Sequence, residues 1–449
     1  MAKLWKKKYE LDKAVEDFTV GDDYLWDMKL IKADVIGNIA HSTMLQKIGI
    51  LSEEELLKIK KNLIDILDLN EKGNFTIKKE DEDVHTAVEN FLTERLGDIG
   101  KKIHTARSRN DQILLDVRLY SKERLFEMIE NVLNLCKILL EFSKENEFVP
   151  MPGRTHTQRA MPSSVGLWTS SIVESLIDDL YLLKSTFKIN DQSPLGSAAS
   201  YGVNLNIDRE YVASLLGFEK VQNNVLYANN SRGKIESIII FALSQVMMDL
   251  SKFANDLILF SIPEFNYFTL PEEFCGGSSL MPQKRNPALL ELTRAKAQVV
   301  NSNYLRVAGI ITSLYSGYNR DFQLTKGPLM ESFDITQQTL YILGYFIPKI
   351  KVNKEVLIQS FTPEVYATDK VLELVKEGVP FRDAYKEVGI NLESLNNKNP
   401  IDNIKSKKHT GATGNLGLDK IEKILKEEEK ELLSKKEAFM KKIDQLVKI

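Results

Sequence analysis

Residues 111–148 contain neither glycine nor proline, and their apolar side chains recur at spacings of three and four. Residues at these spacings lie on one face of an α-helix, so the pattern predicts a single long helix. A helix of this length cannot cover its apolar stripe by itself and needs neighbours of similar length. The stretch therefore predicts a bundle of long helices.

The same helical spacing recurs along the chain, whereas strand signals are scarce. Further long helices are predicted over residues 162–187, 231–261, 287–314 and 327–345. The helix over 231–261 is apolar almost all round near residues 238–241, so it must be buried on several faces. Association of identical chains through the bundle is the economical explanation. The pattern therefore predicts an all-α fold and a homo-oligomer.

The segments on either side of the long helices differ from them. Residues 1–110 contain shorter helices, including one over 52–69 with Ser52 as its N-cap. Beyond residue 352 the helices shorten again, and the last segment, 418–449, has the spacing of an amphipathic helix that packs against the body. We therefore expect three domains, with bounds at 1–110, 111–352 and 353–449.

Composition excludes several classes of function. The 60 basic and 63 acidic residues give a net charge of -3, which offers no basic surface for nucleic acid. The most apolar stretch, 235–260, is interrupted by charged side chains, so it predicts a buried helix and no membrane span. The two cysteines, Cys136 and Cys275, are far apart in sequence and fit a reducing cytoplasm. The five histidines form no metal-binding motif.

Three polar clusters stand just ahead of predicted long helices. They read HTARSRND at 104–111, GRTHTQRAMP at 153–162 and GGSSLMPQKRNP at 276–287. Unpaired backbone N–H groups and the helix dipole favour anions at a helix N-terminus. Loops of this kind that meet at a bundle end, or across subunits, would form a site for a small polyanion.

Each cluster taken alone also has a purely structural interpretation. Asn110 or Asp111 can cap its helix. Pro162 and Pro287 suit the first helical position, with Asn286 as the cap before Pro287. The role of Asn286, as helix cap or as ligand of a substrate, stays open at this point.

Two further features favour chemistry over capping. Gly276 and Gly277 would let the serine loop close over a substrate. A fourth polar segment, YNRDFQLTK at 318–326, adds donors between two predicted long helices. Together with a histidine and serines that can move protons, these features predict a reaction on a polyanionic small molecule with no metal and no cofactor.

One of these clusters resembles a known signature. The segment GSSLMPQKRNP at 277–287 matches every fixed position of the aspartase/fumarase signature, Gly-Ser-Ser-x-Met-Pro-x-Lys-x-Asn-Pro. Within that superfamily the chain is similar to the argininosuccinate lyase family over nearly its whole length. The matching segments are KLW at 3–5, DEDVHTAVE at 81–89, HTARSRND at 104–111, THTQRAMP at 155–162, PLGS at 194–197, SLMPQKRNP at 279–287 and YNRDFQLTK at 318–326.

The resemblance implies a carbon–nitrogen lyase that cleaves argininosuccinate into arginine and fumarate in arginine biosynthesis. It implies a cytoplasmic homotetramer whose central helices form a twenty-helix core. Each active site then draws loops from three different subunits.

The resemblance also implies catalytic roles. Ser278 and His156 match the two proton-transfer residues, and Glu291 matches the acidic partner of the histidine. Which of Ser278 and His156 is the base stays open, and a lone histidine is more often structural. The positions that match substrate contacts are Ser108, Asn110, Thr155, Ser279, Lys284, Asn286, Tyr318, Gln323 and Lys326.

The sequence departs from the family pattern in three places. Lysines at 6–8 replace the usual residues after KLW, and the segment 224–233 lacks two expected acidic residues. The segment FTVGDDYLWD carries two extra residues where the family has a substrate-binding serine. Gly21 is the candidate for that place, and no site residue is transferred to the segment.

Other functions are weighed beside this one. Adenylosuccinate lyase and fumarase also release fumarate, but the segment at 318–326 argues against both. A crystallin-like structural protein is a second alternative, and retention of His156, Ser278, Lys284 and Asn286 argues against it. A helical scaffold without activity would not need the polar loops.

Overall fold

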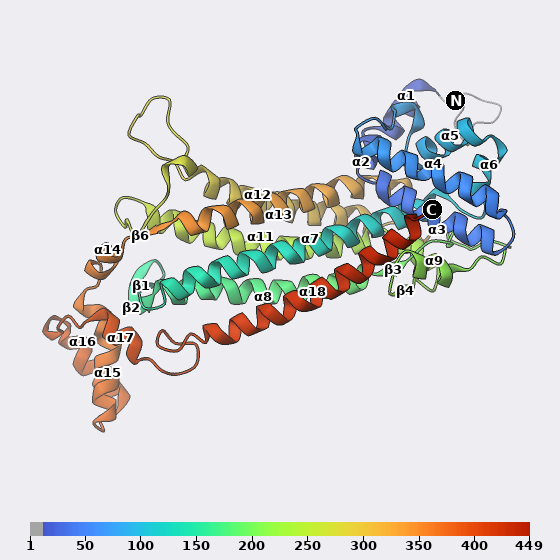
Figure 1. The fold of residues 1–449 in the computed structure, drawn as a ribbon. Coiled ribbons are helices and arrows are strands. Elements are labelled where there is room, and N and C mark those ends of the chain that lie inside the picture. Colours follow the sequence, from blue (N-terminus) through green and yellow to red (C-terminus); the bar gives the residue numbers. More distant parts are fainter. Residues whose placement is uncertain (1–11) are drawn as a thin grey trace.

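The structure is a computed structural model that describes residues 12–449. The segment KLW at 3–5 and the lysines at 6–8 lie outside the described residues. Five long helices lie side by side and form the centre of the molecule (Figure 1). They are α7 (Arg109–Glu145), α8 (Val165–Asn190), α11 (Lys234–Ser261), α12 (Ala288–Ile311) and α13 (Lys326–Phe346). The predicted all-α fold is confirmed, since the described strands form only three two-stranded sheets.

The predicted start of the second long helix is wrong. Residues before it form a β-hairpin, in which β1 (Pro150–Thr155) pairs with β2 (Gln158–Ser164) and Pro162 lies opposite Pro152. Pro162 therefore does not occupy the first helical position. Ser164 is the N-cap of α8 instead, and its hydroxyl accepts the N–H of Leu167 at 3.0 Å. In a two-stranded hairpin both strands are edges, where prolines without an N–H are tolerated.

The predicted caps of the other two clusters are also wrong. Ser108, not Asn110 or Asp111, is the N-cap of α7. The helix α12 begins at Ala288 with Pro287 at its cap position, and no side chain caps it. Asn286 instead stabilises the preceding loop, because its Nδ2 donates to the carbonyl of Gly277 at 3.2 Å.

Short helices gather at one end of the bundle (Figure 1). They are α1 (Lys13–Val20), α2 (Asp23–Asp27), α3 (Ile31–Lys47), α4 (Glu53–Glu71), α5 (Val84–Leu96) and α6 (Asp98–Lys101). Ser52 caps α4 as predicted, and Glu55 completes a reciprocal capping box with it. This group of helices packs on α7 through α3 and on α13 through α2.

The chain ends with a helix that returns along the bundle. Beyond α13 a second group of short helices lies at the opposite end, and α18 (Leu418–Val447) then runs back against α7 (Figure 1). Apolar residues of α18 such as Leu425 and Phe439 are buried, while ion pairs such as Lys144–Glu422, 2.9 Å, border the contact. The predicted amphipathic helix is confirmed. The second group consists of α14 (Lys354–Gln359), α15 (Ala367–Lys376), α16 (Phe381–Ile390) and α17 (Pro400–Ser406).

The remaining elements are short. They are α9 (Arg209–Leu215), α10 (Val225–Asn230), β3 (Gln192–Ser193), β4 (Lys220–Val221), β5 (Phe268–Thr269), β6 (Lys351–Val352), and the 3-10 helices η1 (Lys79–Asp81), η2 (Lys102–His104), η3 (Glu272–Phe274), η4 (Arg320–Thr325), η5 (Ile347–Lys349), η6 (Pro363–Tyr366) and η7 (Leu392–Ser394).

The helix α11 forms the centre of the core. Among the described residues it alone has the length and hydropathy of a membrane span, but 56% of its apolar window is buried within the bundle. Its charged Glu236 is buried, and the carboxylate accepts the N–H of Gly233 at 2.9 Å beside the buried Arg118. These contacts are those of a core helix, as the interrupted apolar stretch predicts.

Candidate active site

The structure separates the sequence-predicted residues into two groups. Ser108, at the start of α7, lies near the first group of short helices together with Asn110, Tyr318, Gln323 and Lys326. The remaining seven lie at the opposite end, around the β1–β2 hairpin and the start of α12 (Figure 1). They are Thr155, His156, Ser278, Ser279, Lys284, Asn286 and Glu291.

A cavity of about 470 Å³ opens beside the first group. Asn110, Tyr318, Gln323 and Lys326 line it, together with charged side chains of both signs. The charged residues are Asp23, Asp27, Glu82, Asp83, Arg109, Arg232, Arg320 and Lys326. A wall with both signs of charge suits a zwitterionic ligand better than a simple polyanion.

Helix capping leaves the Asn110 side chain available. The Ser108 hydroxyl accepts the N–H of Asn110 at 3.2 Å, and the carboxylate of Asp111 accepts the N–H of Ser108 at 2.8 Å. Asp111 is itself buried, where it also accepts the N–H groups of Gly196 and Ala198, both at 2.9 Å. Within the described part of the chain the Asn110 amide group has no partner, so it can bind a ligand in the cavity.

Gln323 and Lys326 are already engaged. The Gln323 amide donates to the carbonyls of Thr19 at 3.1 Å and Val20 at 3.2 Å, which holds the end of α1 against the cavity. Lys326 is only 2% exposed and pairs with Asp23 at 2.9 Å and with Asp27.

The pKa of Lys326 reflects this pairing. Burial acts to lower its pKa, but the charges of Asp27 and Asp23 outweigh that effect and raise it. Lys326 is therefore a permanently charged member of an ion-pair cluster.

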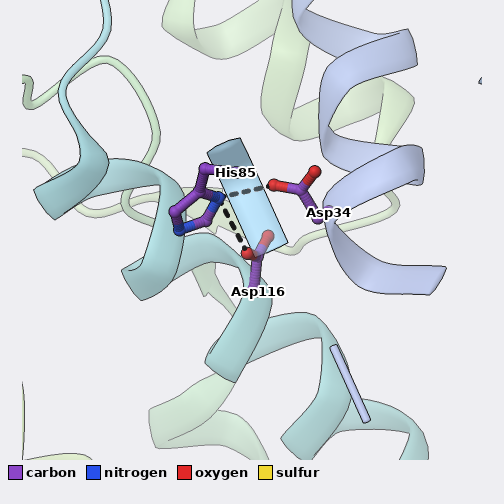
Figure 2. A group of neighbouring side chains, drawn as sticks. All are labelled: Asp34, His85 and Asp116. Atoms are coloured by element: carbon purple, nitrogen blue, oxygen red, sulfur yellow. Dashed lines mark hydrogen bonds and ion pairs between the residues drawn. The ribbon is translucent and has the colours of Figure 1, made fainter. Parts of the chain in front are cut away.

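His85 lies at the cavity between two buried carboxylates (Figure 2). Its Nδ1 is 2.7 Å from Asp34 Oδ1 and 3.6 Å from Asp116 Oδ2. Burial acts to lower the pKa of His85, but the charge and hydrogen bond of Asp34 raise it overall. Burial and the charge of Asp34 raise the pKa of Asp116 well above its usual range. The imidazole forms a hydrogen bond with Asp34 only, because 3.6 Å is too long for a hydrogen bond to Asp116.

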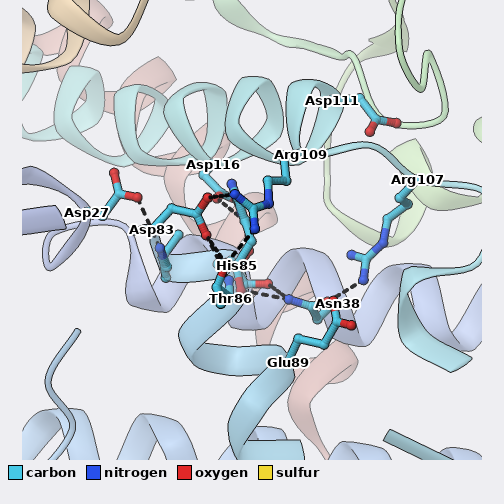
Figure 3. Close-up of polar contacts among 12 residues, drawn as sticks. Asp27, Asn38, Asp83, His85, Thr86, Glu89, Arg107, Arg109, Asp111 and Asp116 are labelled. Atoms are coloured by element: carbon cyan, nitrogen blue, oxygen red, sulfur yellow. Dashed lines mark hydrogen bonds and ion pairs between the residues drawn. The ribbon is translucent and has the colours of Figure 1, made fainter. Parts of the chain in front are cut away.

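The network continues on both sides of His85 (Figure 3). Asn38 donates to Asp34 at 2.8 Å and accepts from Arg107 at 2.7 Å. On the other side, Arg109 pairs with Asp83 at 3.0 Å and donates to Thr86 at 3.0 Å. These bonds fix α5 against α3 and α7, so the cavity has a rigid wall.

At the opposite end His156 occupies the tip of the hairpin. His156 and Thr157 form its two-residue turn, and both have left-handed backbone angles, with φ of 51° and 61°. Such turns normally contain asparagine or glycine, so a histidine and a threonine there cost conformational energy. Arg154 stabilises the turn by donating to the Thr157 carbonyl at 2.8 Å. His156 itself is exposed.

The serine loop is closed at its base and exposed at its tip. Gly276 and Asn286 exchange backbone hydrogen bonds of 2.9 and 2.8 Å. Within the loop, the Ser278 hydroxyl oxygen accepts the N–H groups of Met281 at 3.0 Å and Leu280 at 3.4 Å. Two N–H donors aimed at one hydroxyl oxygen favour its deprotonated form. Lys284 is exposed on the same loop.

Glu291 lies in the first turn of α12 and is exposed. Among the described residues no hydrogen bond or ion pair joins Glu291 to His156 within one chain. The same holds for Ser278 and His156. The catalytic roles of these three residues therefore stay predictions.

Comparison with known proteins identifies the family. Residues 7–301 match the family model described as Lyase. The chain is 48% identical to the argininosuccinate lyase of Thermotoga neapolitana over 386 residues, which cover 86% of this chain and 97% of that protein. It is 42% identical to the argininosuccinate lyase of Phocaeicola vulgatus, with 95% of each chain covered. The chain belongs to the argininosuccinate lyase family.

A solved structure agrees on the fold. The crystal structure of EDDS lyase in complex with formate superposes with a TM-score of 0.81 over 97% of this chain and 95% of that chain, at 20% identity. At that identity the likeness supports the helical fold alone.

Within this member of the argininosuccinate lyase family, sequence reasoning missed several cavity residues. Asp23 and Asp27 lie in the segment 21–27, to which no site residue was assigned. His85 belongs to the matching segment DEDVHTAVE, and Arg232 to the divergent segment 224–233. A signal for Asp27 was present: it lies four residues after Asp23 in a helical segment, a spacing that places both carboxylates on one helix face.

Proposed function

We propose that the protein is an argininosuccinate lyase, which cleaves argininosuccinate into arginine and fumarate by β-elimination. The observation that carries this proposal is the Ser278 loop, a complete superfamily signature in which two backbone N–H groups approach one serine oxygen. The 48% identity to a named argininosuccinate lyase selects this reaction among those of the superfamily.

In the proposed reaction a proton leaves the succinyl carbon beside a carboxylate, and the guanidino nitrogen departs from the neighbouring carbon. The difficulty is the negative charge that accumulates on that carboxylate. The Ser278 oxygen, which its N–H donors stabilise, exchanges the carbon proton. Lys284 and the N-terminus of α12 then hold the developing charge.

His156 carries the other proton transfer. Its place at a strained hairpin tip suits a group that must reach a substrate held by other segments. Glu291 orients the imidazole once the two side chains meet across subunits. Thr155, Ser279 and Asn286 then hold the succinyl portion of the substrate.

The proposed assembly is a homotetramer with a twenty-helix core. The 24 residues of α12 separate the two groups of site residues by roughly 36 Å, at ~1.5 Å per residue, so one small substrate cannot contact both. Neighbouring subunits that run in opposite directions would bring the two ends together, with loops from three chains at each site.

An exposed apolar face supports this assembly. Large apolar side chains remain exposed on the three neighbouring helices α11, α12 and α13. They are Phe241, Met248, Leu292, Val299, Leu305, Tyr341 and Tyr345. Exposed apolar side chains on neighbouring helices fit contact with a second copy of the bundle.

We also propose a cytoplasmic location and a role in arginine biosynthesis. Cys136 and Cys275 are both free thiols, which suits a reducing compartment. The location has its own test, fractionation of the native cells with detection by antibody.

The function is tested by incubating the purified protein with argininosuccinate and following fumarate by its ultraviolet absorbance. Parallel incubations with malate and adenylosuccinate test the two other fumarate-releasing reactions. We expect fumarate from argininosuccinate alone. A correctly assembled protein that releases none would refute the proposal, and fumarate from either other substrate would reassign it.

A further inference from the structure

Asp23 is the accessible member of the ion-pair cluster in the cavity. The side chain of Asp23 is 14% exposed, whereas Asp27 is 0% and Lys326 is 2% exposed. Asp23 also lies in the segment 21–27, where the family motifs assign no site residue. Of these three lining residues, Asp23 is therefore the one that a ligand in the cavity reaches most readily.

The charge of this cluster is negative. One ammonium group, Lys326, lies between the two carboxylates of Asp23 and Asp27, which leaves a net charge of one negative unit. A carboxylate of the substrate would be repelled here, and a cationic group would be attracted. The sequence predicts that Lys326 contacts the substrate, but its ammonium group already pairs with two carboxylates of its own chain.

Three arginines lie beside this cluster in the cavity lining. The charge of Arg232 acts to lower the pKa of Asp23, and its guanidinium lies 5.6 Å from the centre of the Tyr318 ring. Arg109 is neutralised by Asp83 at 3.0 Å and Glu82 at 3.2 Å, and Arg320 donates to the carbonyl of Thr19. The cavity thus offers an anionic corner at α2 and, beside it, the cationic Arg232 and Arg320.

We propose that Asp23 is a specificity-determining residue that binds a cationic group of the arginine portion of the substrate. Asp27 and Lys326 are its positioning residues. Lys326 pairs with both carboxylates and so holds the Asp23 carboxylate in place. The proposal rests on the proposed function and names the residue that distinguishes the arginine end of the substrate. The cation is either the guanidinium or the α-ammonium group.

The ionisation of Asp23 gives the proposal a second readout. Burial raises the pKa of Asp23, Lys326 opposes that rise and Asp27 adds to it, with a net value of about 6. The groups that face it are Lys326, Asp27 and Arg232, with Asp83, Glu82, Arg109 and His85 elsewhere on the cavity wall. Below that pH Asp23 becomes neutral, so substrate affinity should fall.

The kinetic test uses Asp23→Asn, which keeps the size of the side chain and removes its charge. We expect KM for argininosuccinate to rise about 10- to 100-fold, the usual effect of losing a hydrogen bond to a charged group, with a much smaller change in kcat. Wild-type KM should rise as pH falls below 6, and the variant should lack this dependence. Asp23→Glu should restore most of the affinity.

The matched control is Asp17→Asn. Asp17 pairs with Lys79 on the exposed surface at 2.7 Å and lies outside the cavity lining, so its KM should stay at the wild-type value. Thermal unfolding checks that the Asp23 variants fold, and Asp23→Ala provides a second neutral variant if Asp23→Asn unfolds. An unchanged or lowered KM in a folded neutral variant overturns the proposal.

Calorimetry with L-arginine and L-citrulline separates this proposal from the proposed function, because it requires no turnover. Loss of arginine binding in Asp23→Asn, with citrulline binding retained, assigns the guanidinium. Loss of binding of both assigns the α-ammonium group. Equal arginine binding in wild type and variant, or no arginine binding by either, overturns the role of Asp23. Absence of fumarate release, with Asp23-dependent arginine binding intact, refutes only the proposed function.

Discussion

The imidazole of His85 joins three helices through one nitrogen atom. Its Nδ1, on α5, is 2.7 Å from Asp34 Oδ1 on α3 and 3.6 Å from Asp116 Oδ2 on α7. All three side chains are buried, and the protonated imidazole compensates the negative charge of Asp34. This contact fixes the wall of the cavity that also presents Asn110.

Replacing His85 should destabilise the fold. His85→Gln leaves Asp34 without its charged partner, and losing one member of a buried pair costs ~3–5 kcal/mol of unfolding free energy. Urea unfolding at one fixed protein concentration measures this difference. Lys58→Gln, which breaks the exposed pair with Glu54 at 2.6 Å, should cost far less, because solvent screens that pair. Equal losses in the two variants would contradict the role of His85.

The stabilisation by His85 should also depend on pH. The folded-state pKa of His85 is raised above its unfolded value of 6.5. Its contribution is therefore fully present below pH 6.5 and is lost as pH rises through the folded pKa. We expect the stability difference between wild type and His85→Gln to be largest at acidic pH and to shrink as pH increases. A difference that grows with pH would be inconsistent with a protonated His85.

Ser278→Ala should abolish turnover without preventing substrate binding. The change removes the oxygen that accepts the N–H groups of Met281 and Leu280, and proton transfer by a placed group contributes about 10²- to 10⁴-fold. Fumarate release measures turnover, and calorimetry with argininosuccinate measures binding. Ser279→Ala serves as the neighbouring variant and should lose less activity. Near-normal turnover in Ser278→Ala would exclude it as the proton-transfer group.

Two inactive variants should restore activity when they assemble together. Ser278 and Asn110 lie near opposite ends of the bundle, so in the proposed tetramer one site takes them from different chains. Coexpression of Ser278→Ala with Asn110→Ala chains should therefore recover up to about a quarter of wild-type sites. Coexpression of Ser278→Ala with Ser278→Gly should recover none. No recovery in a mixed oligomer would show that each site belongs to one chain.

Sequence periodicity predicted the long helices because their apolar stripes extend over many turns. It did not predict the structure at residues 162 and 286, where local hydrogen bonds determine the backbone conformation. Pro162 lies in a hairpin that the long-range pattern does not encode, and Asn286 bonds to Gly277 in place of capping α12. Short segments such as these depend on partners elsewhere in the fold.

The candidate site was predictable only where a motif carried it. Ser278 and His156 stand in recognisable loops, but the ion pairs of Lys326 with Asp23 and Asp27 join residues about 300 positions apart in the chain. No local spacing reveals such a contact. The burial that makes Lys326 a cluster member follows from the packing of α2 on α13.

The carboxylates of Asp179 on α8 and Asp249 on α11 predict how the stability of the bundle changes at alkaline pH. Burial, the charge of Asp249 and a hydrogen bond with Asp249 raise the pKa of Asp179 to about 8. The folded pKa of Asp179 lies above its unfolded value of 3.8. Its contribution to folding stability is therefore fully present below about pH 4 and is lost as pH rises through 8. Asp249 also accepts a hydrogen bond from the Ser175 hydroxyl.

Asp179→Asn should therefore stabilise the protein at alkaline pH. The amide can still donate to Asp249 but carries no charge to repel it, so Tm at pH 9 should rise above that of wild type, while the gain at pH 5 should be smaller. Thermal unfolding followed by circular dichroism at both values measures the effect. Glu174→Gln, an exposed substitution on the same helix, should change Tm little at either pH. A lower Tm for Asp179→Asn at pH 9 would contradict the raised pKa. It would show that a favourable contact stabilises the charged carboxylate of Asp179.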